Sequence, residues 1–179
     1  MVNLKNALGN KVEKDNQMAA IKYDSLMVEN EEDKLLLGIN VSTSNKKDAL
    51  YKNIVMNYNK VYNFVTMDLG KRDDEFGYPI LMTDADNYKD KEVSYFLGIP
   101  LSKKIGVSDN NFNFRSVNPS QNYVMYYKGN YEGRIKAIQQ LIQKAKKDEM
   151  RFGDIRQTFI ERPMEGQAVN MKLSLSVYK

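Results

Sequence analysis

The sequence of 179 residues contains no cysteine and no histidine. Without cysteine the chain has no disulfide framework and no thiol chemistry, so we expect a cytoplasmic protein. Without either residue type, a zinc site with the usual ligands and catalytic triads built on histidine or cysteine are excluded. No glycine-rich phosphate loop of the Walker or dinucleotide-binding type is present either. We therefore expect no metal and no cofactor, and any catalysis has to rest on carboxylates, tyrosines, lysines or water.

Long apolar runs and blocks of like charge are also missing. No stretch approaches the about 20 apolar residues that a membrane span needs, and residues 1–17 lack the apolar core of a secretory signal. The formal net charge is +4, and the lysines are scattered rather than gathered into the basic stripe typical of nucleic-acid-binding proteins. We expect neither a membrane partner nor direct binding to nucleic acid.

What the chain does contain is an ordinary globular composition in which two kinds of period alternate. Hydrophobic residues make up 42% and charged residues 28% of the sequence, which is typical of a folded domain. Residues 34–44 are apolar and β-branched and predict a strand. Residues 45–65 repeat apolar side chains every three or four positions and predict a helix. Asn45 is the expected N-cap of this helix and Gly70 its expected stop.

Two further strands complete this first set of elements, and a second set of the same order follows. The strands of the first set are expected at 77–83 and 92–102. The second set comprises a strand at 121–129, a helix at 130–147 with Asn130 as its cap, and strands at 154–161 and 169–178. The remaining segments are a flexible N-terminal segment (1–21), a short strand or helix within 18–28, and a linker at 103–114.

A match between the two halves of the chain indicates a repeat. Residues 75–103 and 151–179 align without a gap at an offset of 76 positions, which places Phe152 on Phe76 and Leu173 on Leu97. One strand–helix–strand–strand unit cannot bury the face of its strands alone, whereas two units side by side can share one sheet.

We therefore predict an α+β domain over 22–179. Two repeat units, at about 34–102 and 121–178, are expected to form one pseudo-symmetric antiparallel sheet with the helices packed on it. A cleft is expected at the junction of the units, which is a common place for ligands to bind.

Three phrases of the sequence resemble a known family. LLGINVSTSN (36–45) is similar to its opening strand and turn, and YPILMTDADNYKDKEVSYFLGIPLS (78–102) to its central hairpin. YVMYYKGNYEGRIKAI (123–138) is similar to the family's second strand, which enters the second helix through a Lys-Gly turn. The chain resembles the GyrI-like small-molecule-binding domains, also called effector-binding domains of AraC- and MerR-type regulators. Within these it resembles the stand-alone integron-cassette subgroup.

The resemblance implies a cleft for amphipathic or aromatic molecules, often cations, and a regulatory protein partner where occupancy is relayed. The typical cleft has a buried glutamate in the middle strand of the second unit, followed two residues later by tyrosine. Aligning that tyrosine on Phe159 places Gln157 at the glutamate position, whereas a shift of four residues places Glu161 there and Pro163 at the tyrosine position. The offset of 76 favours the first register, and in both registers Gln157, Phe159 and Glu161 face the same way. Since a glutamine does not neutralise a cation, a cationic ligand is less expected here than in the family.

Aromatic residues supply the other candidates for the cleft. Tyr58 and Tyr62 lie on the apolar stripe of the first helix, where plain core packing is the alternative to lining the cleft. Tyr95 alternates with Phe96 along its strand and Tyr127 with its neighbour Tyr126, so one member of each pair is expected to reach the cleft. A few of the ten methionines are expected to supply adaptable lining, and most are expected to lie in the core. No catalytic residue is assigned, and the candidate ligand-binding residues are Gln157, Phe159, Glu161, Tyr95, Tyr127, Tyr62, Tyr58 and Met82.

Three functions remain open. The leading one is a stand-alone protein that senses or sequesters small amphipathic or aromatic molecules. The second, implied by some stand-alone members of the wider family, is a hydrolase of strained cyclopropane-containing metabolites. With Glu161 as its base, this function requires a carboxylate inside the cleft with a raised pKa. The third is a module that binds a larger protein, which an exposed apolar patch without a deep cleft would favour.

Overall fold

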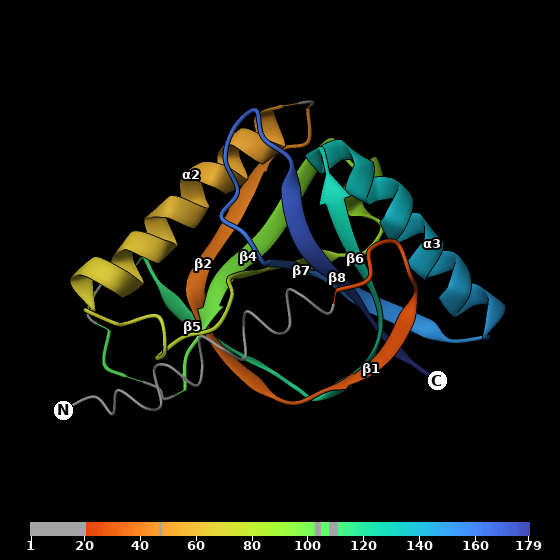
Figure 1. Cartoon of the computed structure of the whole chain (residues 1–179), viewed down its shortest axis with the longest axis horizontal. Helices are drawn as coiled ribbons and strands as arrows, with labels where there is room; N and C mark the ends of the chain where they lie inside the picture. Colours follow the sequence, from red (N-terminus) through yellow and green to blue (C-terminus); the bar gives the residue numbers. More distant parts are fainter. Residues whose placement is uncertain (1–20, 47, 103–104, 108–110) are drawn as a thin grey trace.

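One antiparallel sheet of eight strands carries both helices on one of its faces (Figure 1). The computed structural model describes residues 21–46, 48–102, 105–107 and 111–179. The predicted flexible segment 1–21 lies outside the described residues except for its last position. An α+β fold with one antiparallel sheet is confirmed.

The elements follow the predicted order of strands and helices. The strands are β1 (Met27–Glu31), β2 (Lys34–Ser44), β3 (Ile80–Asp84), β4 (Glu92–Pro100), β5 (Asn113–Val117), β6 (Ser120–Gly129), β7 (Arg151–Phe159) and β8 (Val169–Tyr178). The two long helices are α2 (Ala49–Asn63) and α3 (Arg134–Lys147). Three shorter helical segments are the π-helical η1 (Phe64–Asp68) and the 3₁₀ turns η2 (Asn87–Lys89) and η3 (Tyr131–Gly133).

The strands are ordered β1-β6-β8-β7-β3-β4-β2-β5 across the sheet. At the centre of this order β3 pairs with β7, and Leu81 lies opposite Gln157, the residue 76 positions further along the chain. Strands β8 and β6 follow on the side of β7, and β4 and β2 follow on the side of β3. That the two halves are copies of one unit stays a prediction.

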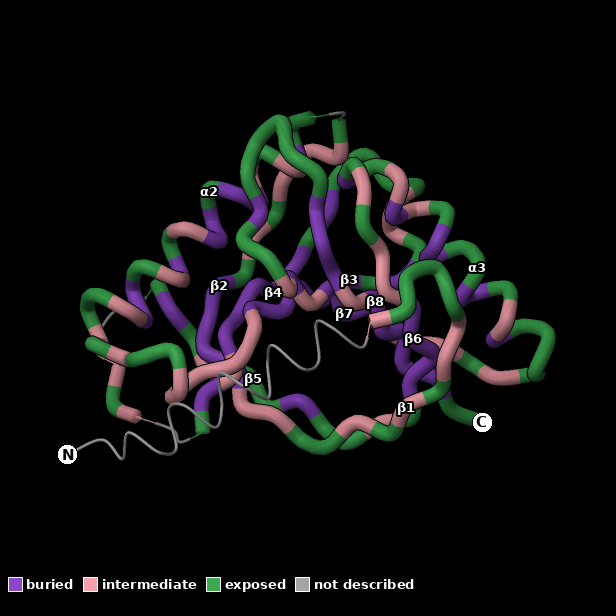
Figure 2. Tube along the Cα trace, in the orientation of Figure 1, coloured by how far each residue is buried: buried purple, intermediate pink, exposed green. Residues whose placement is uncertain are grey.

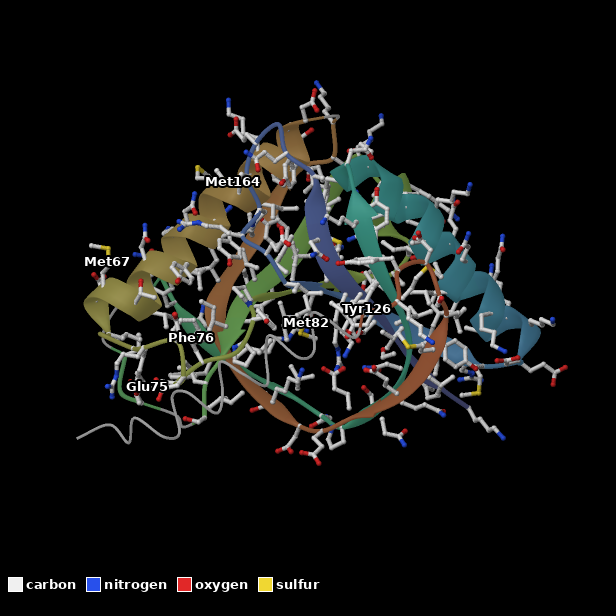
Figure 3. All side chains as sticks on the ribbon, in the orientation of Figure 1. Met67, Glu75, Phe76, Met82, Tyr126 and Met164 are labelled. Atoms are coloured by element: carbon white, nitrogen blue, oxygen red, sulfur yellow. The ribbon has the colours of Figure 1, made fainter. Side chains whose placement is uncertain are left out.

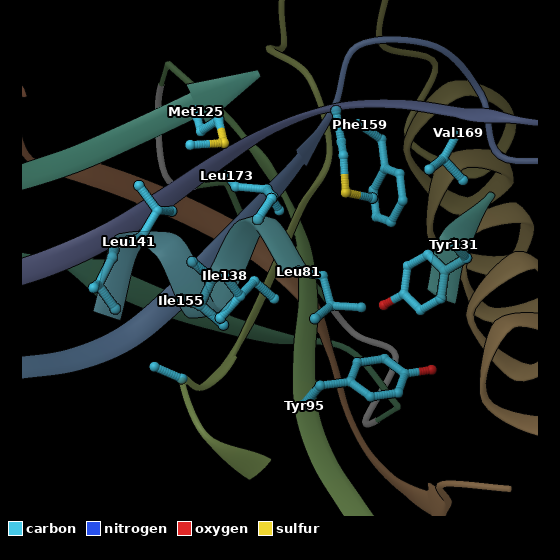
Figure 4. Close-up of a cluster of buried hydrophobic side chains, with 14 of the residues drawn as sticks. Leu81, Tyr95, Met125, Tyr131, Ile138, Leu141, Ile155, Phe159, Val169 and Leu173 are labelled. Atoms are coloured by element: carbon cyan, nitrogen blue, oxygen red, sulfur yellow. The ribbon is translucent and has the colours of Figure 1, made fainter. Parts of the chain in front are cut away.

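The side chains divide between the two faces of the sheet with the two-residue period of a strand. On the helix face a large core joins both helices to the central strands, and Figure 4 shows part of it, including Leu81, Tyr95, Ile138 and Phe159. The opposite face holds a smaller cluster, formed by Leu36, Ile80, Met82, Phe96 and Val117. Figure 2 shows that burial is concentrated along the central strands and on the sides of α2 and α3 that face them.

The ends of α2 differ in part from the predicted ones. The residue before α2 is Asp48, which has a left-handed φ of 69°, and the prediction of Asn45 as the N-cap is wrong. The Asn45 side chain donates instead to the carbonyl oxygens of Tyr88 and Asp90, at 3.1 and 2.9 Å, and so ties this corner to the β3–β4 connection. After the π-helical η1 the chain leaves the helix at Gly70, which has a φ of 64°, in agreement with the predicted stop.

Both edge strands were missing from the sequence-based expectation. Strand β5 pairs with β2 and begins at Asn113, so the interpretation of 103–114 as a linker is wrong at its C-terminal end. Strand β1 pairs with β6, and the segment 18–28, read as a strand or helix, contributes its start at Met27. Residues 18–20, 103–104 and 108–110 lie outside the described part of the chain.

Candidate functional site

The two helices converge by their N-terminal ends above the central β3–β7 pair (Figure 1). The rings of Tyr51 from α2 and Tyr131 from η3 stack there, with centroids 5.0 Å apart and planes inclined by 24°. Beneath the helices a cavity is lined by Leu50, Ile54, Leu81, Thr83, Ala85, Asn87, Tyr88, Val93, Tyr95, Tyr131, Arg134, Ile138 and Gln157. Its free volume of about 10 Å³ has room for about one water molecule. The junction between the helices is therefore present but closed by the protein's own side chains.

Gln157 is the polar centre of this cavity. It lies on β7 with an exposed fraction of 2%, and its Oε1 accepts a hydrogen bond of 2.8 Å from the Tyr131 hydroxyl. Burial raises the pKa of Tyr131, and the nearby Arg134 charge offsets part of that effect. The net shift is upward, so the phenol stays protonated and donates. Gln157, one of the two residues considered for the glutamate position of the resemblance, is thus a buried residue of the cavity wall.

Arg134, which the sequence-based reasoning did not select, is the charged residue of the cavity wall. It is the first residue of α3 and has an exposed fraction of only 5%. Its guanidinium carbon lies 3.7 Å from the centroid of the Tyr131 ring, and its Nη1 donates to the Tyr131 carbonyl oxygen at 3.0 Å. Its Nε is buried and has no hydrogen-bond partner. Its spacing of four residues from Ile138 was the available signal, because that spacing puts both side chains on the buried face of α3.

Tyr95 joins the cavity wall to α2 through a buried polar network. Its hydroxyl donates to Asn53 Oδ1 at 2.7 Å and accepts from Asn57 Nδ2 at 3.1 Å. Burial raises the pKa of Tyr95, and the hydrogen bond from Asn57 offsets only part of that effect. Tyr95 thus faces the helices, while its neighbour Phe96 belongs to the cluster on the opposite face.

Phe159 and Tyr58 are both buried in the helix-face core, beside the cavity rather than on its wall. Their rings meet edge to face, with centroids 5.8 Å apart and an interplanar angle of 86°. Burial raises the pKa of Tyr58 to about 12. Tyr62 is half-buried one turn further along α2, and its ring stacks on that of Tyr58 with centroids 6.0 Å apart. The guanidinium carbon of Arg162 lies 5.2 Å from the centroid of the Tyr62 ring.

Of the eight predicted site residues only Gln157 and Tyr95 line this cavity, and three of the others are not buried in the helix-face core around it. Glu161 is exposed, and its Oε1 accepts from the Asn170 side chain at 3.1 Å. Tyr127 is half-buried, and its hydroxyl donates to the Asn130 carbonyl oxygen at 2.5 Å. Met82, labelled in Figure 3, belongs to the cluster on the opposite face of the sheet.

The face of the sheet opposite the helices carries two more open hollows. One, of about 280 Å³, is lined by residues that include Asn40, Met82, Phe96, Arg115 and Asp154. The other, of about 480 Å³, lies beside the β5–β6 connection and shares Met82 and Arg115 with the first. Both are walled largely by polar side chains. Neither contains any of the buried tyrosines other than Tyr95, which lines the smaller one as well as the closed cavity.

Two further properties bear on function. Among the described residues no three histidine, cysteine, aspartate or glutamate side chains are grouped so that they could hold a metal ion. In the same part of the chain no helix is long and apolar enough to cross a membrane.

Comparison with known proteins finds solved structures of the same fold but no match by sequence. No family model and no curated protein matches the sequence. The solved EcmrR C-terminal domain matches with a TM-score of 0.66 at 11% identity, over 87% of this chain and 98% of that domain. A hydrolase encoded by lin2189 from Listeria innocua matches with a TM-score of 0.61 at 9% identity, over 93% of this chain and 98% of the hydrolase.

Two more solved structures share the fold. SAV2435 bound to tetraphenylphosphonium matches with a TM-score of 0.56 at 12% identity, over 86% of this chain and 94% of SAV2435. An integron cassette protein from Vibrio cholerae matches with a TM-score of 0.54 at 9% identity, over 87% of this chain and 97% of the cassette protein. At these identities the matches show a common fold. The chain therefore shares the fold of the EcmrR C-terminal domain and of SAV2435, in agreement with the resemblance to GyrI-like domains.

Proposed function

We propose that this chain is a stand-alone binding protein for small amphipathic or aromatic molecules, which it holds between α2 and α3 above the β3–β7 pair. The observation that carries the proposal is the Tyr131–Gln157 hydrogen bond on the wall of a cavity at the centre of the fold. A concave apolar site with a few convergent polar groups is the usual form of a small-molecule site. SAV2435, which shares the fold, binds an aromatic molecule.

Binding requires the site to open, because the closed cavity admits only about one water molecule. The Tyr51–Tyr131 stack is the contact that bridges the two helices. The β7–β8 connection lies over α2 and is held by two contacts: the Tyr51 hydroxyl donates to the Met164 carbonyl oxygen at 2.9 Å, and Arg162 donates to Asn59 Oδ1. We assign ligand entry to the separation of the stacked rings. Because only the open molecules bind, the apparent Kd equals the Kd of the open form divided by the fraction of molecules that are open.

Thermal unfolding with a panel of aromatic cations, neutral aromatics and lipophilic acids tests the proposal. A ligand at about 100 times its Kd stabilises the folded state by about 2.7 kcal/mol. For a chain of this size that corresponds to a rise in Tm of about 5–10 °C. No rise with any class of compound would contradict the proposal.

A pair of variants locates the binding. Gln157→Leu removes the polar group of the cavity and is expected to reduce the ligand-induced shift, measured from the variant's own Tm. Ser174→Ala is the control, because Ser174 is equally buried but does not line this cavity. An equal loss of the ligand-induced shift in both variants would place the ligand elsewhere.

The hydrolase hypothesis finds no base in this site. It required a carboxylate inside the cleft, but Glu161 is exposed, and no described residue that lines the cavity carries a carboxylate. A regulatory protein partner stays a prediction. Exposed Met56, Met67 and Met164 lie on or beside α2, and Figure 3 labels the last two. This is the surface where a protein partner would be sought if no small molecule stabilises the chain.

A further inference from the structure

We propose that the cavity between α2 and α3 selects an anion: an aromatic or amphipathic acid whose negative group is received by Arg134. This inference rests on the proposed function, because it assigns the charge of the ligand that the same site binds. It follows from three features of the site, namely an unsatisfied buried cation, a wall without carboxylates and two converging helix N-termini.

The buried cation is incompletely satisfied. An arginine side chain is always protonated and offers five N–H donors. The Arg134 Nη1 donates to the Tyr131 carbonyl oxygen, and the guanidinium carbon lies 3.7 Å from the centroid of the Tyr131 ring, but the buried Nε has no partner. Among the described residues it is the one that has a buried side-chain nitrogen or oxygen without a hydrogen bond. An unpaired buried N–H group lowers the stability of the closed protein. A ligand that brings a hydrogen-bond acceptor to this group removes that cost.

No described carboxylate lines the cavity beside Arg134. No described carboxylate forms an ion pair with its guanidinium within 4.0 Å. The polar neighbours on the cavity wall, among them Gln157, Asn87 and Thr83, are neutral. Glu132 and Asp24, whose charges reach Tyr131 and Tyr127, are exposed and do not line the cavity.

The helices add to the positive potential at the same place. The N-terminal end of an α-helix carries a partial positive charge, which attracts anions and repels cations within the first turn. Arg134 occupies the first position of α3, and Leu50 from the first turn of α2 lines the same cavity. A cationic ligand would thus meet two helix N-termini and a buried guanidinium, whereas a carboxylate or sulfonate would gain charge-assisted hydrogen bonds.

Two probes of nearly the same shape and opposite charge test the inference on the full chain. Tetraphenylborate is an anion and tetraphenylphosphonium a cation, and each carries four phenyl rings. Calorimetric titration is expected to give a Kd about tenfold or more lower for tetraphenylborate, because its negative charge is attracted to the Arg134 guanidinium although it offers no hydrogen-bond acceptor. Tighter binding of tetraphenylphosphonium would overturn the inference and leave the proposed function standing. Binding of neither probe would contradict both.

Three variants assign the preference to Arg134. Arg134→Met keeps the length of the side chain without its charge and is expected to remove most of the preference for tetraphenylborate. Arg134→Lys keeps the charge and is expected to retain the preference, which separates charge from packing. Lys136→Met removes one positive charge from the exposed face of the same helix and is expected to change neither affinity. If Arg134→Met folds and binds tetraphenylborate as tightly as the unmodified chain, the inference is wrong.

Discussion

The buried tyrosine hydroxyls around the cavity each have a specific partner. Tyr131 donates to Gln157 at 2.8 Å, and Tyr95 donates to Asn53 at 2.7 Å. A buried hydroxyl with a partner fixes the position of its ring, because moving the ring leaves a polar atom unpaired in an apolar environment. These bonds therefore hold the closed form of the site in one geometry.

Tyr131→Phe is expected to destabilise the protein by about 1–3 kcal/mol, because Gln157 Oε1 loses its donor while it stays buried. Urea unfolding measures the change in the free energy of unfolding. Tyr178→Phe is the control, since Tyr178 is 52% exposed and is expected to change stability by less than about 0.5 kcal/mol. An equal effect of the two substitutions would show that the Tyr131–Gln157 bond contributes nothing.

The positions of these side chains could be predicted from sequence only in part. Strand alternation predicted that Gln157, Phe159 and Glu161 share a face. Gln157 and Phe159 are buried on the helix side, whereas β7 ends at Phe159 and Glu161 is exposed. The choice between Tyr95 and Phe96 was open, because both are large aromatic residues in a strand buried on both faces. The role of Arg134 was missed, since a single arginine at a helix start is usually exposed.

Each central strand was predictable because it has at least one strongly apolar face. The predicted ranges 34–44 and 169–178 coincide with β2 and β8. The edge strands have no such apolar face: β1 contains no buried residue, and Val117 is the one buried residue of β5. Their pairing is set by backbone hydrogen bonds to β6 and β2, which the sequence pattern does not record.

The β2–β4 pair depends on two glycines that lie opposite each other, Gly38 and Gly98. A Cβ atom at Gly38 would lie 1.9 Å from the Leu97 carbonyl oxygen, a backbone atom that cannot rotate away. Gly38→Ala is therefore expected to cost about 2 kcal/mol or more, as measured by urea unfolding. Gly106→Ala is the matched control, because nothing described lies within 4 Å of a Cβ there. Equal stability of both variants would contradict the close approach of β2 and β4.

Strand β1 is fastened to the sheet by the Glu31 carboxylate. Glu31 pairs with Lys34 at 2.5 Å and with the buried Arg156 of β7 at 3.1 Å, and it also accepts from Asn122. Partial burial pushes the pKa of Glu31 up, but the hydrogen bond and charge of Lys34, with Arg156 and Lys172, outweigh it and leave the pKa lowered.

A lowered carboxyl pKa makes stability depend on pH in the acid range. The stabilisation is complete above the ordinary glutamate pKa of 4.5 and is lost as the pH falls through the lower pKa of the folded state. Unfolding midpoints measured between about pH 6 and 3 should therefore fall more steeply for the unmodified chain than for Glu31→Gln. Glu92→Gln, at an exposed position of β4, should keep the steep dependence. An identical slope in all three proteins would contradict a stabilising role for Glu31.

The molecule as a whole is a sheet with two helices whose N-terminal ends meet above its central strand pair. The fold class was predictable from the order of the elements, and a closed cavity lies at the junction where the cleft was expected. The closure of the site was not predictable. It depends on the contact between Tyr51 and Tyr131, which are 80 positions apart, and no local pattern sets that distance. Under the proposed function, the cost of opening lowers the apparent affinity of every ligand by the same factor.

The most direct test of the account is a methyl NMR titration of the full chain with the tightest ligand from the panel. Neighbouring residues of β3 provide an internal comparison, since Leu81 lines the cavity under the helices and Ile80 lies on the opposite face. We predict saturable shifts of the Leu81, Ile54 and Ile138 methyl signals, with the Ile80 and Leu36 signals unmoved. Shifts confined to Ile80 and Leu36 would place the ligand on the far side of the sheet and contradict binding between α2 and α3.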